Sequence, residues 1–330
     1  MARTTDRPAA AAAVTLADVA LAAGVAVSTA SRALANPERV SRVTRERVQD
    51  FARRMGYQHL RAGSQMLAML INDVTNPFHF GLIRGAEAQA RAAGHTLVIA
   101  EAEEDPEVEQ LHADRLGPAV DGLILVASRL PDADLAAVTA TRPCVLFNRE
   151  LAGVAQVNAD AAESSRQIVD HLLALGHRSA VFLGGPAAAR SDRVRWAALT
   201  SFATDRGLSL SRLGPFLPTL DQGAAAADEG LATGATAFVA FNDLLAIGVL
   251  QRLRARGVRV PADLSVIGHD DAFGADFCQP PLTTVAVPSE QAGRLLVDLL
   301  LEAVSGRGPR RLSVATYLKV RESTGPAPHS

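Results

Sequence analysis

The sequence predicts an α/β protein in which a small all-α head precedes a two-lobed core with two parallel sheets. From residue 66 onward, short apolar runs alternate with stretches of helical spacing, a pattern typical of parallel sheets covered by helices. The alternation continues over about 260 residues, which fits two sheets better than one. The first 65 residues show three short helical patterns and many arginines instead.

Charge is divided unevenly along the 330 residues. Up to Gln65 there are ten arginines and five acidic residues, a net charge of +5, whereas the remainder has 23 basic and 30 acidic residues, a net charge of −7. A basic head on an acidic body indicates nucleic-acid contact confined to one end. With 48% hydrophobic residues the chain can bury a core larger than one ordinary domain needs.

Several classes of protein are disfavoured. Cys144 and Cys278 lack the spacing of a metal site or redox pair, so we expect no metal and a reducing, cytoplasmic setting. The alanine run at 9–13 imitates a secretion signal, but Asp18 interrupts the apolar stretch, and no segment is long enough to cross a bilayer. Nucleotide-binding, phosphate-binding and hydrolase motifs are absent, so we expect neither catalysis nor a cofactor.

The head is expected to be a helix-turn-helix domain at 14–60 behind a disordered tail at 1–13. Thr15 and Asp18 form a variant capping box for a helix at 16–23, and Gly24 supplies the tight turn. A second helix follows at 27–34 and ends before Asn36, and a third is expected at 44–55. The inward positions of the first two helices and their turn are Ala20, Val25, Ala30 and Leu34, and those of the third are Val48, Phe51, Ala52 and Met55.

The second predicted helix turns four residues outward: Val27, Ser28, Thr29 and Arg32. This is the geometry of a recognition helix. The alternative is an ordinary alanine-rich helical hairpin with a solvated arginine.

The segments 14–20 (VTLADVA), 23–41 (AGVAVSTASRALANPERVS), 44–48 (TRERV) and 55–57 (MGY) resemble the DNA-binding head of the LacI/GalR repressor family. The resemblance implies that Val27, Ser28 and Arg32 approach base edges, that Thr29, Ser31 and Asn36 hold the phosphate backbone, and that Thr15 belongs to the DNA-binding set. Ala26 departs from the family pattern, which often has a capping serine there.

The linker at 61–66 is about half a dozen residues shorter than the hinge segment that the family carries. The resemblance implies that Leu60 takes the place of the leucine that wedges into the minor groove, but Gly63 would weaken a hinge helix. We therefore expect a shortened hinge.

Strands are expected at 67–71, 96–100, 122–126, 144–147, 180–183, 237–241 and 264–267, and helices at 81–93, 161–175 and 244–256. Polar residues follow these strands repeatedly, at 72–73, 148–149, 242–243 and 269–271. In open parallel sheets, ligands bind beyond the carboxyl ends of the strands, so the clusters indicate a polar cleft. Helix caps or turn formers are the alternative for each cluster taken alone.

The core also resembles the effector-binding domain of the same family, which is similar to periplasmic sugar-binding proteins. The matching segments include 76–78 (NPF), 121–124 (DGLI), 147–149 (FNR), 171–177 (HLLALGH), 241–243 (FND), 266–271 (VIGHDD) and 281–285 (PLTTV). The resemblance implies that Arg149, Arg195, Asn242 and Asp270 hold a small polar effector, with Ser191, Phe78 and His79 lining the cleft. For Arg195 the alternative is an exposed charge, and for Asp270 a cap.

The resemblance also implies an effector-binding and dimerisation domain at 67–318, with one subdomain at about 67–159 plus 288–316 and the other at about 160–287. A C-terminal tail follows at 319–330, and its Gly-Pro-Ala-Pro segment is expected to be disordered. The expected protein is a homodimeric, sequence-specific regulator, a repressor that binds double-stranded operator DNA under the control of a sugar or sugar-like effector. A carboxylate- or purine-like effector would also suit two arginines. The alternative is a solute-binding receptor of a transport system.

Overall fold

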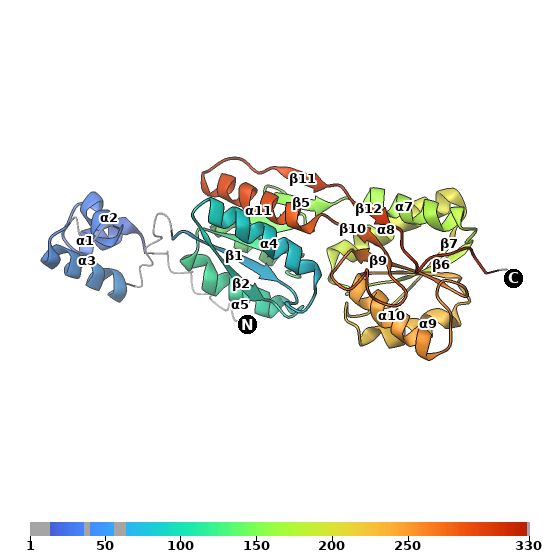
Figure 1. Ribbon diagram of the computed structural model, residues 1–330. Helices are drawn as coiled ribbons and strands as arrows, with labels where there is room; N and C mark the ends of the chain where they lie inside the picture. The colour runs from blue at the N-terminus through green and yellow to red at the C-terminus, as the bar shows by residue number, and fades with distance from the viewer. Residues whose placement is uncertain (1–13, 36–39, 56–63, 329–330) are drawn as a thin grey trace, which may run out of the picture. The chain divides into compact units, whose positions relative to one another are not determined.

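The computed structural model describes residues 14–35, 40–55 and 64–328, which belong to two compact units, a head within residues 1–64 and a body within residues 65–330 (Figure 1). The expected tail at 1–13, Asn36, Leu60 and residues 61–63 of the linker lie outside the described residues.

The head has the three predicted helices, α1 (Leu16–Ala22), α2 (Val27–Ala35) and α3 (Arg42–Arg54). Thr15 and Asp18 form the predicted capping box, and Gly24 has a φ of +62° in the turn between α1 and α2. Among the described helices none is by itself long and apolar enough to span a membrane, and α1 and α2 meet that test only when taken together across a bend of 102°. The fully buried core of the head consists of small and β-branched side chains: Val19, Ala20, Ala23, Ala30, Ala33, Val48 and Ala52.

The body contains two six-stranded sheets. The first sheet is parallel throughout, in the order β11-β5-β4-β3-β1-β2. The second has the order β12-β10-β9-β8-β6-β7 and is parallel except for β12, which runs antiparallel to β10. The strands of the first sheet are β1 (Met66–Ile71), β2 (Thr96–Glu101), β3 (Gly122–Val126), β4 (Cys144–Phe147), β5 (Ala155–Ala159) and β11 (Arg311–Val314), and those of the second are β6 (Ser179–Leu183), β7 (Ser209–Leu213), β8 (Ala237–Ala240), β9 (Ser265–Asp270), β10 (Thr283–Ala286) and β12 (Tyr317–Lys319).

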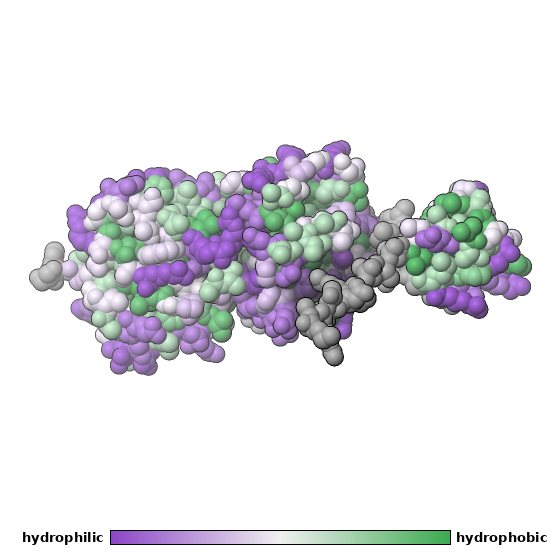
Figure 2. Space-filling model, turned by 180° about the vertical axis from the view of Figure 1, so that it is seen from behind, coloured by the Kyte–Doolittle hydropathy of each residue, from purple (hydrophilic) through white to green (hydrophobic). Residues whose placement is uncertain are grey.

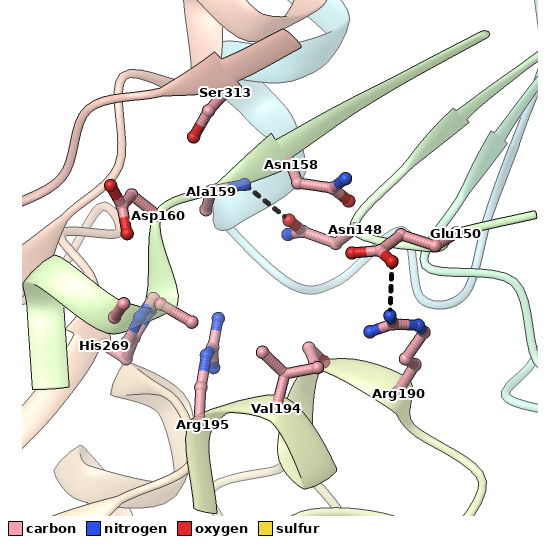
Figure 3. Close-up of a pocket in the computed structure, with 13 residues that line it drawn as sticks. Asn148, Glu150, Asn158, Ala159, Asp160, Arg190, Val194, Arg195, His269 and Ser313 are labelled. Carbon is pink, nitrogen blue, oxygen red and sulfur yellow. Dashed lines mark hydrogen bonds and ion pairs between the residues drawn. The ribbon is translucent and has the colours of Figure 1, made fainter. Parts of the chain in front are cut away.

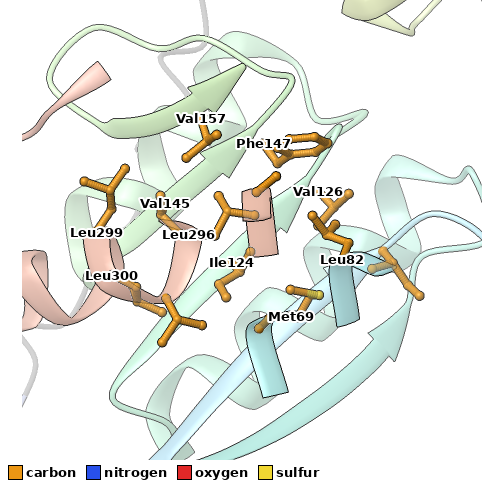
Figure 4. Packing of buried hydrophobic residues seen from close by; sticks show 14 of the residues in the cluster. Met69, Leu82, Ile124, Val126, Val145, Phe147, Val157, Leu296, Leu299 and Leu300 are labelled. Atoms are coloured by element: carbon orange, nitrogen blue, oxygen red, sulfur yellow. The ribbon is translucent and has the colours of Figure 1, made fainter. Parts of the chain in front are cut away.

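Helices cover both faces of each sheet, because the central strands are apolar on both sides. In β1, Leu67 and Met69 pack towards α4 and α11, whereas Ala68 and Leu70 belong to the opposite core cluster (Figure 4). The helices of the first lobe are α4 (Phe78–Ala92), α5 (Pro106–Leu116), α6 (Asp132–Thr141) and α11 (Ser289–Val304), with the 3-10 turn η2 (Gly117–Ala119), and those of the second lobe are α7 (Ala161–Ala174), α8 (Arg190–Arg206), α9 (Gln222–Ala232) and α10 (Asp243–Ala255).

Glycines allow α4 and α11 to pack closely. A Cβ on Gly85 would overlap the carbonyl oxygen of Glu290, and a Cβ on Gly293 would overlap that of Leu82. These two helices, far apart in sequence, therefore form one layer over the first sheet (Figure 1).

The chain passes between the lobes three times, after β5, after β10 and after β11. The hydroxyl of Thr316, in the third crossover, donates to the carbonyl oxygen of Asp160 in the first, over 2.8 Å. Two crossovers are therefore joined directly beside the space between the lobes.

All seven predicted strands are present, but the sequence analysis did not name β5, β7, β10, β11 and β12. β7 is an exposed edge strand with the sequence SLSRL, and β11 and β12 are also mostly exposed. Such strands lack the continuous apolar run that marks a buried parallel strand, and they depend on pairing with distant segments.

The Gly-Pro-Ala-Pro segment of the C-terminal tail, residues 325–328, is ordered, contrary to expectation, because the N–H of Gly325 donates to the hydroxyl of Ser265 and the N–H of Ala327 to the carbonyl oxygen of Leu175. Lys319 ends β12, and Ser323 is fully buried. The Ser323 hydroxyl donates to the carbonyl oxygen of Val266 and accepts from the N–H of Thr283. The proline-rich composition suggested disorder, but these hydrogen bonds fix the segment 317–328 against the second lobe.

Candidate functional site

The outer face of α2 is the candidate DNA-reading surface. Val27, Ser28 and Arg32 are exposed and Thr29 and Ser31 are half-buried, whereas Ala30 on the opposite side is fully buried. The exposed residues of α2 thus combine the apolar Val27 with the polar Ser28 and the charged Arg32, and Figure 2 shows hydrophobic and hydrophilic residues side by side on the face of the head that it presents. This mixture can contact both thymine methyl groups and polar base edges.

Arg32 lies along its own helix. Its Nε donates to the carbonyl oxygen of Ser28 over 3.1 Å, and its Nη2 donates to the Ser28 hydroxyl over 3.5 Å. Among the described residues the guanidinium has no acidic partner. Thr15 differs, because its hydroxyl donates to Asp18 over 2.7 Å and helps lower the pKa of that carboxyl.

Between the lobes of the body lies a small inner chamber of about 60 Å³. It collects residues from the carboxyl ends of strands in both sheets, as the sequence analysis predicted for a polar cleft. Six of the seven predicted effector residues line it: Phe78, His79, Ser191, Arg195, Asn242 and Asp270.

Arg195 and Asp270 form the charged centre of the chamber. Arg195 Nη2 lies 3.7 Å from Asp270 Oδ1, and Arg195 Nη1 donates to the carbonyl oxygen of Phe241 over 2.6 Å. The guanidinium also lies over the Phe241 ring, 5.1 Å from its centroid. Since Arg195 is only 9% exposed, the alternative of a solvated charge is wrong. Its position requires a partner, and Asp270 supplies it.

His79 and Asn242 present neutral groups to the chamber. His79 Nδ1 lies 2.8 Å from the carbonyl oxygen of Asp73, which can only accept, so Nδ1 carries the proton. Burial lowers the pKa of His79, which keeps the ring neutral. Asn242 caps α10 by accepting from the N–H of Leu245 over 3.0 Å, so it is both a cap and a lining residue.

Arg149 does not reach either chamber of the cleft. Its Nη2 donates to the carbonyl oxygen of Leu130 over 2.9 Å and to Asp132 over 2.7 Å. Its neighbour Asn148 lines the cleft instead, with a φ of +49°. The left-handed backbone at Asn148 turns its side chain to the cleft, while the bonds to Leu130 and Asp132 hold Arg149 away from it.

Left-handed backbone conformations cluster around the inner chamber. Glu104, Ala127, Asn148 and Asp270 all have positive φ values and all line it. A non-glycine residue in this conformation costs on the order of 1 kcal/mol and is enriched at functional sites. The four residues follow or end β2, β3, β4 and β9, so the strain lies where the strands deliver side chains to the cleft.

A larger outer chamber of about 280 Å³ adjoins the inner one and shares Asn148, Ser191 and Arg195 with it (Figure 3). The two lobes meet at its edge, where Arg190 Nη2 at the start of α8 contacts Glu150 Oε2 over 2.6 Å. His269 lies at its base, and burial lowers the pKa of this imidazole to about 4. Among the described residues, no group of three His, Cys, Asp or Glu side chains is arranged to hold a metal ion.

The sequence analysis did not assign several lining residues to the site. Asn72, Asn148 and His269 belong to the strand-end clusters it had noted, so that signal could have found them. Arg129 and Glu104 had no such signal. They form a bidentate pair of 2.6 and 3.1 Å in the inner chamber, between loops that follow different strands.

Comparison with known proteins supports both the helix-turn-helix head and the two-lobed body. Residues 15–59 match the model of bacterial regulatory proteins of the lacI family, and residues 169–324 match a periplasmic binding protein-like domain. The transcriptional repressor CytR of Escherichia coli K12 is 32% identical over 89% of this chain and 91% of its own. One solved structure that resembles the chain is a complex of the regulator CelR with cellobiose, which is 31% identical with a TM-score of 0.70 and covers 94% of this chain and 99% of that one. Another is a Lac repressor dimer bound to operator and an anti-inducer, which is 26% identical with a TM-score of 0.71 and covers 95% of this chain and 99% of that one.

A helix-turn-helix head joined to a two-lobed, ligand-binding type of body defines a DNA-binding transcription regulator. The chain belongs to the LacI family of bacterial regulatory proteins. The match at residues 15–59 favours this class over the solute-binding receptor.

Proposed function

We propose that the protein is a homodimeric repressor of genes for sugar or related metabolism, with operator binding controlled by a small polar effector in the cleft. The observation that carries the proposal is that one chain combines the exposed Arg32 face of α2 with the buried Arg195–Asp270 pair between two lobes. The Lac repressor, a dimer in its operator complex, supports the assignment of both partners.

In this proposal Val27, Ser28 and Arg32 read base edges, while Thr29, Ser31 and Thr15 contact the phosphate backbone. The two heads of the dimer occupy half-sites about 10 bp apart in a near-palindromic operator. The domain division follows the sequence analysis, except that residues 319–328 join the second lobe.

The proposed effector is a neutral, hydroxyl-rich molecule. The charged side chains of the inner chamber compensate one another, because Arg195 faces Asp270 and Arg129 pairs with Glu104. With Arg149 bonded to Asp132, the chamber lacks the second free arginine that a carboxylate-like effector would use. Cellobiose, a neutral sugar, is bound by the similar CelR.

An effector that contacts both lobes stabilises one arrangement of the lobes. Because the affinity for operator depends on this arrangement, effector binding changes that affinity. Such coupling is typically about 1–3 kcal/mol, or roughly 5–150-fold in affinity. The mechanism requires no bond making or breaking, so we propose that the protein is not an enzyme. It acts on chromosomal DNA, so we place it in the cytoplasm.

The experiment measures fluorescence anisotropy of an operator duplex, selected from a random pool, with and without sugars that raise the melting temperature of the protein. Asp270→Ala should bind operator as tightly as wild type but lose the sugar response, because the carboxylate that faces Arg195 is missing. Asp205→Ala, at an exposed aspartate of α8, is the matched control. Equal sugar responses of wild type and Asp270→Ala would contradict the assignment of the cleft.

A further inference from the structure

Most of the space in the cleft lies in the outer chamber, which the proposed function leaves unused. This chamber has a volume of about 280 Å³, against about 60 Å³ for the inner one. A cavity of about 150 Å³ suffices for one benzene-sized ring. The inner chamber alone is too small for a ring, but the two chambers, which share Asn148, Ser191 and Arg195, together have room for two ring-sized units. The unit anchored by Arg195 and Asp270 therefore extends from the inner chamber into the outer one.

Small side chains create the outer space. Ala159 and Ala161 line it at the first crossover, and Ser313 lines it from β11 (Figure 3). A larger side chain at any of these positions would project into the chamber. These wall residues lie at the end of β5, at the start of α7 and in β11, next to the crossovers, whereas the inner chamber is lined from the ends of β2, β3, β4 and β9.

The wall also offers unused hydrogen-bonding groups. The side-chain amide of Asn158 and the hydroxyls of Ser191 and Ser313 have no hydrogen-bond partner among the described residues, and Asn148 uses only its Oδ1, which accepts from the N–H of Ala159 over 2.9 Å. Amides and hydroxyls both donate and accept, which matches the hydroxyl groups of a ligand.

Charges on the wall are compensated. Glu150 is paired with Arg190, and Asp160 caps α7 by accepting from the N–H of Glu163 over 3.0 Å. His269 is neutral because burial lowers its pKa. Within the described part of the chain, no Phe, Tyr or Trp side chain lines the outer chamber, whereas Phe78, Phe147 and Phe241 line the inner one. The outer chamber therefore suits a neutral, hydroxyl-bearing unit that needs no stacking surface.

We propose that the effector is a neutral glycoside of two ring-sized units and that its second, hydroxyl-bearing unit occupies the outer chamber. This inference rests on the proposed function, because it places the first unit at Arg195 and Asp270. A disaccharide and a ribonucleoside share this chemistry, and the experiment separates them.

The test is isothermal titration of the full chain with cellobiose, maltose and lactose, with adenosine and uridine, and with glucose, galactose and ribose as single-ring probes. We expect one two-unit class to bind at least about tenfold more tightly than its single-ring components. Ala159→Leu and Ser313→Leu, which fill the outer chamber, should remove this advantage and leave the affinity for the single ring within about twofold.

Ala136→Leu, at an exposed position of α6 outside both chambers, is the matched control and should bind like wild type. Ser313 is itself exposed, so its variant tests the inference even if Ala159→Leu disturbs packing. Single rings that bind as tightly as two-unit ligands, or two-unit affinity that survives both leucines, would overturn the inference and leave the proposed function standing. Binding of no probe at all would overturn both.

Discussion

Asn148 and Arg149 are sequence neighbours with different roles. The positive φ of Asn148 turns its side chain to the cleft, while Arg149 is held by Leu130 and Asp132. The resemblance to the family pointed to the arginine, whose chemistry suits ligand binding. The local backbone gives that position to the asparagine, which makes the cleft less basic than expected.

Recognition of the operator sequence depends most on Arg32. Arg32→Ala should weaken specific operator binding by about 1–3 kcal/mol, since an arginine can contact a guanine bidentately. Its bonds to Ser28 are within one helix, so the fold of the head should not change. Anisotropy with specific and scrambled duplexes measures the loss, with Arg42→Ala, at an arginine paired to Glu46, as the matched control. Unchanged specific affinity would remove Arg32 from the reading face.

His269 should make stability depend on pH. Its pKa falls from 6.5 to about 4 on folding, so the unfolded chain binds a proton that the folded chain does not. The free energy of unfolding should therefore decrease as the pH falls from 6.5 to about 4, and this decrease should be about 3 kcal/mol smaller in His269→Gln. Urea unfolding at a series of pH values measures the difference. Parallel pH profiles for the two proteins would show that His269 is not the group responsible.

At the scale of elements, the start of α8 brings basic residues to the acidic loops of the first lobe. Arg190 pairs with Glu150. The pKa of Asp132 is lowered mainly by its hydrogen bond to Arg149, and Arg193 and Arg190 add to this effect. The Arg190–Glu150 pair joins elements of different lobes beside the outer chamber. It therefore stabilises the arrangement in which the two walls of the cleft approach each other.

Breaking this pair should weaken effector binding. Because both side chains are partly exposed, Arg190→Ala should lower the affinity only by about two- to fivefold, and added salt should reduce the difference. The charge exchange Glu150→Arg with Arg190→Glu should recover most of the loss. Titration calorimetry at low and high salt provides the measurement. An exchanged variant no better than the single one would argue that Arg190 acts in another way.

At the scale of the whole molecule, the C-terminal segment completes the second lobe. β12 pairs with β10, and Arg321 bonds to Asp271 and to the carbonyl oxygen of Leu282. Gly325 accepts from the buried His177 over 3.1 Å, so the last described residues close a polar network inside the lobe.

Deleting residues 321–330 should therefore destabilise the body. The N–H of Thr283 and the ring of His177 would lose partners, and each unsatisfied buried group costs about 1–3 kcal/mol. We expect a loss of about 3 kcal/mol or more in the free energy of unfolding, relative to a chain that ends at residue 328. Exchange of the backbone amide hydrogens in β9 and β10 should become faster as the free energy of unfolding decreases. Equal stability of the two chains would show that the segment is only peripheral.

The head and the central strands of the body were predictable because their signals are local. Apolar spacing, Thr15 with Asp18, and Gly24 define the helices of the head, and buried runs such as 67–71 define strands. β7, β11 and β12 carry weak local patterns and form by pairing with strands elsewhere in the chain, so the sequence analysis did not find them.

The sequence by itself determined the class of protein, the basic reading helix and the presence of a polar cleft, because each follows from residues close together in the chain. Only the tertiary structure decided that Asn148 replaces Arg149 in the cleft, that Arg129 meets Glu104, and that small residues next to two crossovers open an outer chamber. Those arrangements join segments separated by many residues. Their energies depend on burial and partner geometry, which no local pattern encodes.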